Sequence, residues 1–336
     1  MKRFIFGIVI LGIALSLFKA CGGTSGFEVD DEDEPEEILP TEPVAPDGIL
    51  ETVTWNTEWY GNEGNGPDDE FQQTKNIVRV LDSLDADLYA MQEIFSQEAF
   101  NEIVEPMTGY KGFTADFINK GQKMAFLYNT NTIDSLEAGE ISLAEVRETY
   151  RDEWEYYWAN GRPPLFFRFD YHTPNSEQTE FFAVVIHAKA NYGDYQESYK
   201  RRQMAAEGLY YYLLDEHPNA NIILMGDYND DVDESIYYEE QNGEEVYQET
   251  PYDEFTEDTQ HFRIVTKVLS ENKHTASINY MDKGDLIDHI TMSDELFNLY
   301  IDDSATIYEA PLDYIPDFES STSDHLPVWA KFDMAQ

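Results

Sequence analysis

The stretch Ile222-Ile-Leu-Met-Gly-Asp-Tyr-Asn-Asp230 places a carboxylate and an amide directly after an apolar run. The run 221–225 suits a strand in the interior of a sheet, and Gly226 admits a backbone conformation closed to other residues. Asp227 and Asn229 therefore follow the C-terminal end of a predicted strand. Sites converge at such strand ends in α/β proteins, so this stretch predicts both a fold class and a site.

Polar side chains stand in the same way at other strand-like runs scattered through the chain. We place all of them at C-terminal strand ends, except for Asp288 in DLIDHITMS (285–293), which stands where a strand begins. The others are Asn56 in TVTWNTEW (52–59), Glu93 in YAMQEI (89–94), His187 in FAVVIHAKA (182–190), and Asp324 with His325 in STSDHLPVW (321–329).

Each of these residues also has an ordinary structural explanation. Asn56 could cap a turn, and Glu93 could stabilise the N-terminus of the helix that follows it. His187 and Asp288 could be hydrogen-bonded residues near a core, and GDYND could be a polar turn. Single short motifs are weak evidence, and the functional reading depends on the set as a whole.

The hydrophobic pattern predicts alternating strands and helices. Strand-like pairs between the helical stretches favour layered mixed sheets over a purely parallel, doubly wound sheet. We expect an α/β protein with two packed sheets covered by helices. The predicted helices are 71–84, capped by Asp68 or Asp69, 96–105, capped by Ser96, and 196–216. The predicted strands are 50–57, 88–94, 124–128, 166–171, 181–186, 221–225, 262–268, 286–293, 305–308 and 327–332.

Taken in order, the motifs WN, QE, a strand-end His, GDYN, IDH and SDH resemble those of the endonuclease/exonuclease/phosphatase superfamily. That family includes pancreatic-type deoxyribonucleases, abasic-site endonucleases, neutral sphingomyelinases and inositol polyphosphate phosphatases. The resemblance covers nearly the whole folded region and implies a four-layer α/β sandwich, two facing mixed β-sheets flanked by helices. Shorter matches are AFLYNT (125–130), GRPPLFF (161–167), and HAKAN (187–191) followed by YKRRQMAAEGL (199–209).

The resemblance also implies a divalent metal site. Glu93 would be the principal Mg²⁺ ligand, with Asn56 beside it and Asp324 completing or orienting the metal shell. Mg²⁺ prefers a few hard carboxylate oxygens together with water molecules, which agrees with this set. Mn²⁺ or Ca²⁺ are alternatives.

The remaining residues would act on water and phosphate. By the resemblance, Asp227 holds or deprotonates the attacking water, and Asn229 positions the water and a phosphate oxygen. His187 and His325 contact the phosphate, and Asp288 orients His325 and favours its protonated form. Family members differ in whether the Asp or the final His is the base, and we assign Asp227. Four further residues have open or structural readings: Arg162 could reach the phosphate or hold a strand, His289 is structural, and Trp55 and Trp59 line the cleft or pack in the core.

The first 20 residues have the layout of a secretory signal, with Lys2 and Arg3 before an apolar run that ends at Phe18. Cys21, the only cysteine, follows directly and predicts a bacterial lipoprotein anchor, although Lys19 departs from the usual pattern. Residues 21–48 are rich in acids and prolines and predict a flexible tether. We assign residues 49–336 to one domain, outside the cytoplasm at the outer membrane or cell surface, and expect a monomer.

A formal net charge of −47 argues against binding nucleic acid through a broad basic surface. An acidic insertion at about 231–258 adds twelve acids without Lys or Arg, and we interpret it as a solvated peripheral loop. A nuclease or phosphodiesterase is the first expectation for the substrate, and a phosphatase or phosphodiesterase acting on phospholipid headgroups or small phosphate esters is the second. A catalytically silent surface-binding lipoprotein is the alternative from another class.

Overall fold

The computed structural model describes residues 45–142, 144–271, 276–278 and 284–335. The predicted signal, Cys21 and most of the tether lie outside these residues. Within the described residues, no helix combines the length and the apolar character needed to cross a membrane.

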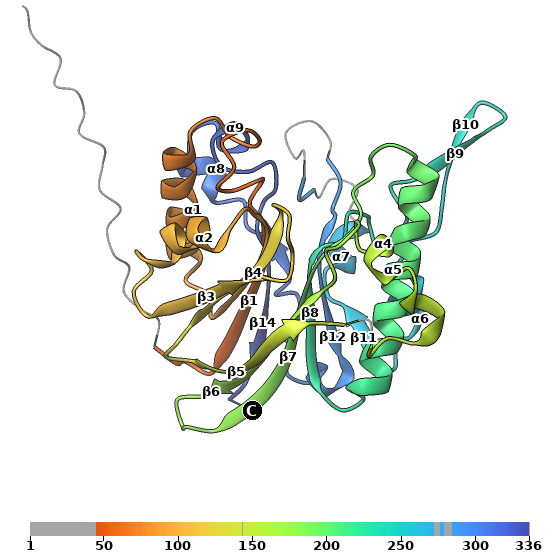
Figure 1. Ribbon diagram of the computed structural model, residues 1–336. Coiled ribbons are helices and arrows are strands. Elements are labelled where there is room, and N and C mark those ends of the chain that lie inside the picture. The colour runs from red at the N-terminus through yellow and green to blue at the C-terminus, as the bar shows by residue number, and fades with distance from the viewer. Residues whose placement is uncertain (1–44, 143, 272–275, 279–283, 336) are drawn as a thin grey trace, which may run out of the picture. The chain divides into compact units, whose positions relative to one another are not determined.

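The first sheet has six strands, with one parallel pair at its centre (Figure 1). β1 pairs parallel with β2 and antiparallel with β14, and the remaining pairs of the sheet are antiparallel. In spatial order the strands are β13 (Thr306–Ile307), β14 (Val328–Asp333), β1 (Ile49–Asn56), β2 (Leu88–Ile94), β4 (Lys123–Asn129) and β3 (Tyr110–Thr114).

The second sheet repeats this plan with six more strands. β7 pairs parallel with β8, and all other pairs of this sheet are antiparallel. In spatial order the strands are β11 (Phe262–Ile264), β12 (Asp288–Ser293), β8 (Asn221–Asp227), β7 (Gln178–His187), β6 (Leu165–His172) and β5 (Ile133–Glu140). Both sheets are therefore mixed, as the sequence pattern predicted.

The two sheets face each other through apolar side chains. β1 contacts β8 and β12, and β2 contacts β7 and β8. Their inner faces contribute Val53, Met91, Val185, Ile223 and Met225 to one continuous core, each at 0% exposure. Burial of this much apolar surface is the main stabilising contribution to the fold.

Helices cover the outer faces of both sheets (Figure 1). α1 (Glu70–Leu84), α2 (Gln97–Val104), α8 (Pro311–Tyr314) and α9 (Phe318–Ser321) lie on the first sheet, while α4 (Trp154–Tyr157), α5 (Tyr195–Glu216) and α6 (Asp253–Glu257) lie on the second. The short α3 (Glu148–Arg151) packs on α5. The predicted α/β sandwich of two facing mixed sheets flanked by helices is confirmed. The remaining short elements are α7 (Lys267–Ser270) and the 3₁₀ turn η1 (Asp294–Leu296).

Local hydrogen bonds explain where the three long helices begin. The Asp69 carboxylate accepts from the Gln72 backbone N–H at 3.0 Å, and the Ser96 hydroxyl accepts from that of Ala99 at 3.1 Å. Asp194 accepts from Glu197 N–H at 3.1 Å in the same way. Such N-caps satisfy backbone donors that the helix itself leaves unpaired. Capping by Asp69 and Ser96 confirms the predicted starts.

Gly226 allows β8 to approach β7 at the strand end that carries Asp227. Its φ is +152°, and a Cβ at this position would lie 2.1 Å from the Ile186 carbonyl oxygen. Real Cβ atoms do not approach a backbone oxygen so closely, so only glycine fits here.

One predicted strand is too long, and two strands of the sheets were not predicted. The predicted strand 262–268 ends at Ile264, and α7 begins at Lys267. β3 and β5 were not predicted, because β3 contains a glycine and β5 is mostly exposed, which removes the alternation of apolar and polar residues.

The acidic insertion is peripheral only in its middle. There, β9 (Tyr238–Gln241) and β10 (Glu244–Tyr247) form an exposed hairpin that projects from the second sheet's side (Figure 1). Its ends fold into the protein, since Val232, Tyr252 and Phe255 are at most 2% exposed.

Candidate active site

The strand registers bring the predicted polar residues to one edge of the two sheets. His187 and Asp288 both pair with Asp227, so the three residues form one row across β7, β8 and β12. On the facing sheet Asn56 pairs with Gln92, the neighbour of Glu93. Parallel pairing places the C-terminal ends of β1 and β2, and those of β7 and β8, at the same edge of each sheet.

Asp324 and His325 reach this edge from the opposite chain direction. We expected them to follow a strand, but they precede β14, which begins at Val328. Because β14 runs antiparallel to β1, its N-terminal end lies beside the C-terminal end of β1. The expected position in the fold is therefore right, and the expected strand end is wrong.

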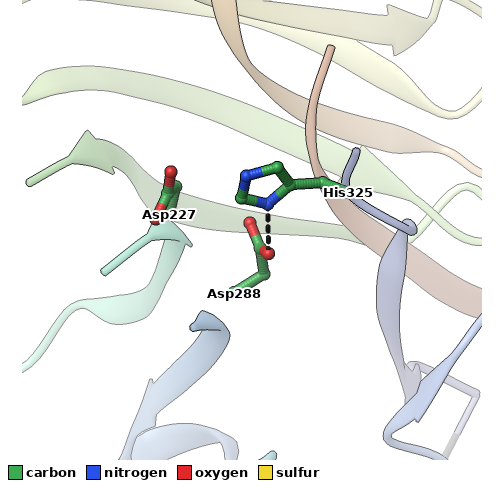
Figure 2. Close-up of side chains that lie close together, drawn as sticks. All are labelled: Asp227, Asp288 and His325. Atoms are coloured by element: carbon green, nitrogen blue, oxygen red, sulfur yellow. Dashed lines mark hydrogen bonds and ion pairs between the residues drawn. The ribbon is translucent and has the colours of Figure 1, made fainter. Parts of the chain in front are cut away.

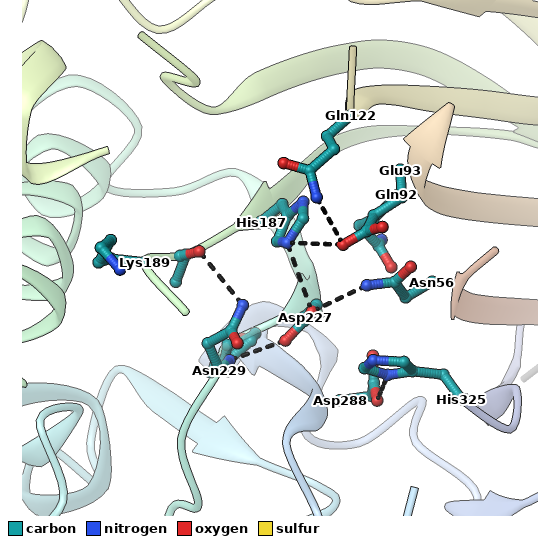
Figure 3. A network of polar contacts seen from close by, with 12 residues as sticks. Asn56, Gln92, Glu93, Gln122, His187, Lys189, Asp227, Asn229, Asp288 and His325 are labelled. Carbon is teal, nitrogen blue, oxygen red and sulfur yellow. Dashed lines mark hydrogen bonds and ion pairs between the residues drawn. The ribbon is translucent and has the colours of Figure 1, made fainter. Parts of the chain in front are cut away.

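Asp227 lies at the centre of the site and is 2% exposed. The side-chain amide of Asn56 donates to its Oδ2 at 3.0 Å, and the backbone N–H of Asn229 donates to its Oδ1 at 2.8 Å. The Asn229 amide in turn donates to the Ala188 carbonyl at 3.2 Å. The GDYN turn is thus held from both sheets (Figure 3).

His187 lies between two carboxylates (Figure 3). Its Nε2 is 3.5 Å from Glu93 Oε1 and 3.6 Å from Asp227 Oδ2, while its buried Nδ1 has no hydrogen-bond partner among the described residues. Glu93 also accepts from the backbone N–H of Trp59 and from the Gln122 amide, both at 3.0 Å. Residues from four separate motifs therefore meet within a few ångströms.

His325 forms a buried pair with Asp288 (Figure 2). Its Nδ1 donates to Asp288 Oδ2 at 2.7 Å, and the Ser277 hydroxyl donates to the same oxygen at 2.7 Å. Asp288 is 0% exposed and His325 is 3% exposed. Asp288 thus fixes the orientation of the His325 ring. A donor that binds phosphate has to be held in such a fixed orientation.

The surroundings shift the pKa values of His187 and His325 in opposite directions. Burial lowers the pKa of His187 well below its usual value, and the charges of Arg162 and His325 lower it further. Burial also acts to lower the pKa of His325, but the charge and hydrogen bond of Asp288, with the charges of Asp324 and Asp227, raise it well above the usual value. At neutral pH His187 is neutral and His325 is an imidazolium.

Asp227 has an unusually basic carboxylate. Burial raises its pKa to about 7, and the Asp288 charge acts in the same direction. The His325 charge and the hydrogen bonds from Asn56 and Asn229 oppose this rise. A carboxylate with such a pKa can accept a proton at neutral pH.

Three acidic side chains, those of Glu58, Glu93 and Asp324, lie at one end of the site. The backbone N–H of Asp324 donates to Glu58 Oε2 at 3.0 Å, and Asp324 Oδ1 is 3.7 Å from His325 Nε2. Burial, and then the charges of Asp324 and Glu93, raise the pKa of Glu58 to about 7. This mutual repulsion, in a set of hard oxygen donors, fits a divalent cation such as Mg²⁺.

Asp227, Asp288 and His325 also offer ligand atoms that lie within 4.8 Å of one another. Their arrangement argues against a metal at that point. Asp288 is already hydrogen-bonded to His325, and a protonated imidazole has no free lone pair with which to bind a cation. We therefore place the metal at the Glu93 end.

Several side chains at the site were not predicted or had an open reading. Glu58 stands two residues after Asn56 in the same motif and could have been noticed there. Gln122 and Ser277 lie in loops without a sequence signal. Arg162 is 7% exposed and donates to Gln122 Oε1 at 2.9 Å, which places it beside the site.

The structure shows where two tryptophans and two arginines lie. Trp55 is buried against Phe318 and donates to the His325 carbonyl, so it belongs to the core. Trp59 is partly exposed next to Glu93. Arg202 forms a buried ion pair with Asp230 at 2.7 Å, and Arg201 stacks on Tyr156. These arginines are structural and do not form a basic surface.

The fold and the site define a phosphoester hydrolase. A sequence model of the Endonuclease/Exonuclease/phosphatase family matches residues 53–325. The chain belongs to this family, whose enzymes depend on divalent metals. No curated protein sequence matches the chain at a significant level.

Solved structures share the fold at low sequence identity. TDP2 of D. rerio complexed with single strand DNA product has a TM-score of 0.58 at 13% identity, covering 85% of this chain and 99% of that one. The human Nocturnin catalytic domain with bound sulfate anion has a TM-score of 0.56 at 16% identity, covering 86% and 96%. An AP endonuclease from Archaeoglobus fulgidus has a TM-score of 0.53 at 17% identity, covering 84% and 99%.

Proposed function

We propose that this protein is a Mg²⁺-dependent phosphodiesterase or nuclease that acts outside the cytoplasm. One observation carries the proposal: the Asp227 carboxylate, the His325–Asp288 pair and the acidic group around Glu93 meet at one edge of the two sheets. Asp227 lies within 4.8 Å of the His325–Asp288 pair, and His187 connects it to Glu93. Water, phosphorus and cation can therefore meet in one place.

The residues divide the chemistry between them. Glu93, Asn56 and Asp324 would hold the cation, which supplies positive charge against the phosphate oxygens. The Asn56 oxygen accepts from Glu58 N–H at 3.0 Å and keeps one lone pair for a ligand. Asn229 orients the attacking water and Asp227 takes its proton as oxygen bonds to phosphorus and the ester oxygen leaves. His325 donates to a phosphate oxygen where charge develops.

The electrostatics support Asp227 as the base. Because the pKa of His325 is raised well above its usual value, this ring holds its proton at neutral pH and cannot accept another. The pKa of Asp227, at about 7, lies near the working range of a general base. Neutral His187 can donate or accept a hydrogen bond at the phosphate without adding charge.

The rim beside Glu93 is aromatic, which favours a nucleotide-containing substrate. Phe95 is 43% exposed, and a Cβ at Gly121 would lie 2.9 Å from Phe95 and 3.7 Å from Trp59, so both rings flank one glycine. Bases stack on such side chains without needing basic residues. This supports single-stranded nucleic acid, in keeping with the DNA product on TDP2. Phospholipid headgroups and small phosphate esters are the second candidate class.

We place the enzyme on the bacterial cell envelope. The motif at Cys21 supports a lipid anchor, and the acidic, proline-rich residues 21–48 support a tether between it and the domain that begins at residue 49. In this arrangement the substrate is a phosphoester at or near the membrane surface. We propose a monomer, because the site is complete within one chain.

The activity is tested with bis(p-nitrophenyl) phosphate and purified residues 27–336. We expect hydrolysis that requires Mg²⁺ and falls at least a hundredfold in Glu93→Ala, because the cation loses its main carboxylate. Glu98→Ala, at an exposed position on α2, is the matched control and keeps full activity. A parallel screen of plasmid DNA, single-stranded DNA, RNA, sphingomyelin and inositol phosphates identifies the substrate class.

The outcomes separate the candidates. Preferential cleavage of nucleic acid supports the nuclease, and preferential cleavage of sphingomyelin or inositol phosphates supports the second candidate. Absence of turnover on every phosphoester, in a folded protein, overturns the enzyme and favours the catalytically silent binding lipoprotein.

A further inference from the structure

We propose that Arg162 and Gln122 are positioning residues that fix the Glu93 carboxylate and connect it to the turn carrying Asp227 and Asn229. The inference rests on the proposed function, because it assigns Glu93 to the metal. Neither residue is needed to explain the chemistry above, yet both are built into the site.

The first half of the connection runs through Gln122. Its amide nitrogen donates to Glu93 Oε1 at 3.0 Å, and its amide oxygen accepts from Arg162 Nη1 at 2.9 Å (Figure 3 shows the Gln122–Glu93 bond). The guanidinium can only donate, so it forces the Gln122 oxygen towards itself and the NH₂ group towards Glu93. Arg162 thereby determines which end of the amide faces the carboxylate.

The second half runs through the backbone after β7. Arg162 Nη2 donates to the Ala188 carbonyl at 3.0 Å, and the Asn229 amide donates to the same oxygen at 3.2 Å. The Ala188 N–H donates to the Asp227 carbonyl at 2.9 Å. A continuous series of hydrogen bonds therefore joins Glu93, on the first sheet, to the water-positioning turn on the second.

Two features of this connection are energetically unfavourable. Arg162 is 7% exposed, and in the part of the chain that the structure describes its Nε has no hydrogen-bond partner, although burying a charge with unsatisfied donors is unfavourable. The backbone is also strained, with φ of +64° at Glu93 and +66° at Gln122. Non-glycine residues keep such conformations only where the surroundings enforce them, typically at functional sites.

The expected role is to hold Glu93 ready for the cation. Without the Gln122 donor, the Glu93 carboxylate keeps the Trp59 N–H on Oε2 but loses its hydrogen bond on Oε1, so it can rotate away from the other acidic oxygens. Hydrogen-bond partners of metal ligands typically contribute about 10–100-fold to metal affinity. We therefore expect Arg162 and Gln122 to act on cation binding itself.

The test measures Mn²⁺ affinity by electron paramagnetic resonance, without substrate, in Arg162→Met and Gln122→Met. Both should bind Mn²⁺ about tenfold more weakly than the wild type. Arg201→Met is the matched control, since Arg201 is 6% exposed, donates to a backbone carbonyl and also has an unpartnered Nε. Gln97→Met, which removes an amide on α2 bonded to Thr114, controls for Gln122. Both controls should keep wild-type affinity.

The double variant decides whether the two residues act as one unit. If they do, Arg162→Met with Gln122→Met weakens Mn²⁺ binding no more than the stronger single change, whereas independent effects multiply. Circular dichroism confirms that each variant is folded. Unchanged affinity in folded variants, multiplying losses, or equal losses in the controls overturn the inference. If instead Glu93→Gln binds Mn²⁺ as tightly as the wild type, the assignment of Glu93 as a metal ligand is overturned.

Discussion

At the scale of single residues, the partners of a buried side chain, rather than its residue type, decide its charge. His187 and His325 both lie at the site and both are almost fully buried. Only His325 has a carboxylate in hydrogen-bond contact, so the pKa shifts of the two rings have opposite signs. The resemblance predicted that Asp288 favours the protonated form of His325. It gave no charge for His187, because the pKa of that ring depends on its burial and on groups distant in the sequence.

Asp288→Asn tests the His325 pair. Asparagine keeps the shape but removes the charge that orients and stabilises the imidazolium, so kcat should fall by about 10²-fold or more. Steady-state kinetics on bis(p-nitrophenyl) phosphate measure the loss. Ser277→Ala removes the second donor to Asp288 and an acceptor of the Ile287 and Asp288 N–H groups, but it keeps the charge and should cost much less. Equal losses in the two variants would show that the charge is not what matters.

His289 tests the effect of burial on stability. Burial lowers the pKa of His289 from 6.5 to about 4, and the ring is held by Thr266 Oγ1 at 2.9 Å and the Leu286 carbonyl at 3.1 Å. Below pH 6.5 the unfolded chain therefore takes up a proton that the folded chain does not. Stability falls as the pH drops, by about 2 kcal/mol between pH 7 and 5 from this residue.

The variant His289→Gln lacks this proton uptake. Its free energy of unfolding in urea should lie below that of the wild type at pH 7, and the difference should shrink by about 2 kcal/mol at pH 5. A difference that stays constant with pH would contradict a depressed pKa for His289.

At the scale of elements, strand direction builds the site. Each sheet contains one parallel pair, and the site uses the ends of both pairs together with the starts of β12 and of β14. The central strands were predicted because their apolar runs are continuous. β3, β5, β9 and β10 were missed, because edge and exposed strands lack a clear apolar pattern.

The β9–β10 hairpin should be dispensable for folding and basic chemistry. Tyr238, Val246 and Tyr247 are 37–44% exposed, and the neck is closed by a bond from Gln248 N–H to the Tyr237 carbonyl at 3.0 Å. Replacing residues 238–247 with Asn-Gly should change the free energy of unfolding by less than about 1 kcal/mol. Activity on bis(p-nitrophenyl) phosphate should also be unchanged. Loss of that activity would assign the hairpin a role at the site.

At the scale of the whole molecule, the charge of −47 opposes contact with polyanions. Arg202 forms a buried ion pair and Arg201 stacks on Tyr156, so neither guanidinium is free to bind a polyanion. Phosphate neutralisation is therefore left mainly to the cation, and affinity for nucleic acid should depend on it.

DNA cleavage should consequently be weak at low Mg²⁺ and increase as Mg²⁺ is raised through the millimolar range. Cleavage of a fluorescent single-stranded oligonucleotide measures this dependence. In a gel-shift assay with EDTA the same oligonucleotide should not bind at physiological salt. Tight binding without metal would contradict the prediction and indicate a basic surface elsewhere.

The sequence alone determined the fold class, the order of the central elements and the set of polar residues at their ends. These follow from local patterns, namely apolar periodicity, capping residues and short motifs. The tertiary structure decided that β14 delivers Asp324 and His325 by an antiparallel approach, that Glu58, Gln122 and Arg162 join the site, and that burial keeps His187 neutral. Those properties depend on burial and on partners far apart in the chain, and electrostatic and hydrogen-bond energies are set only when the chain is folded.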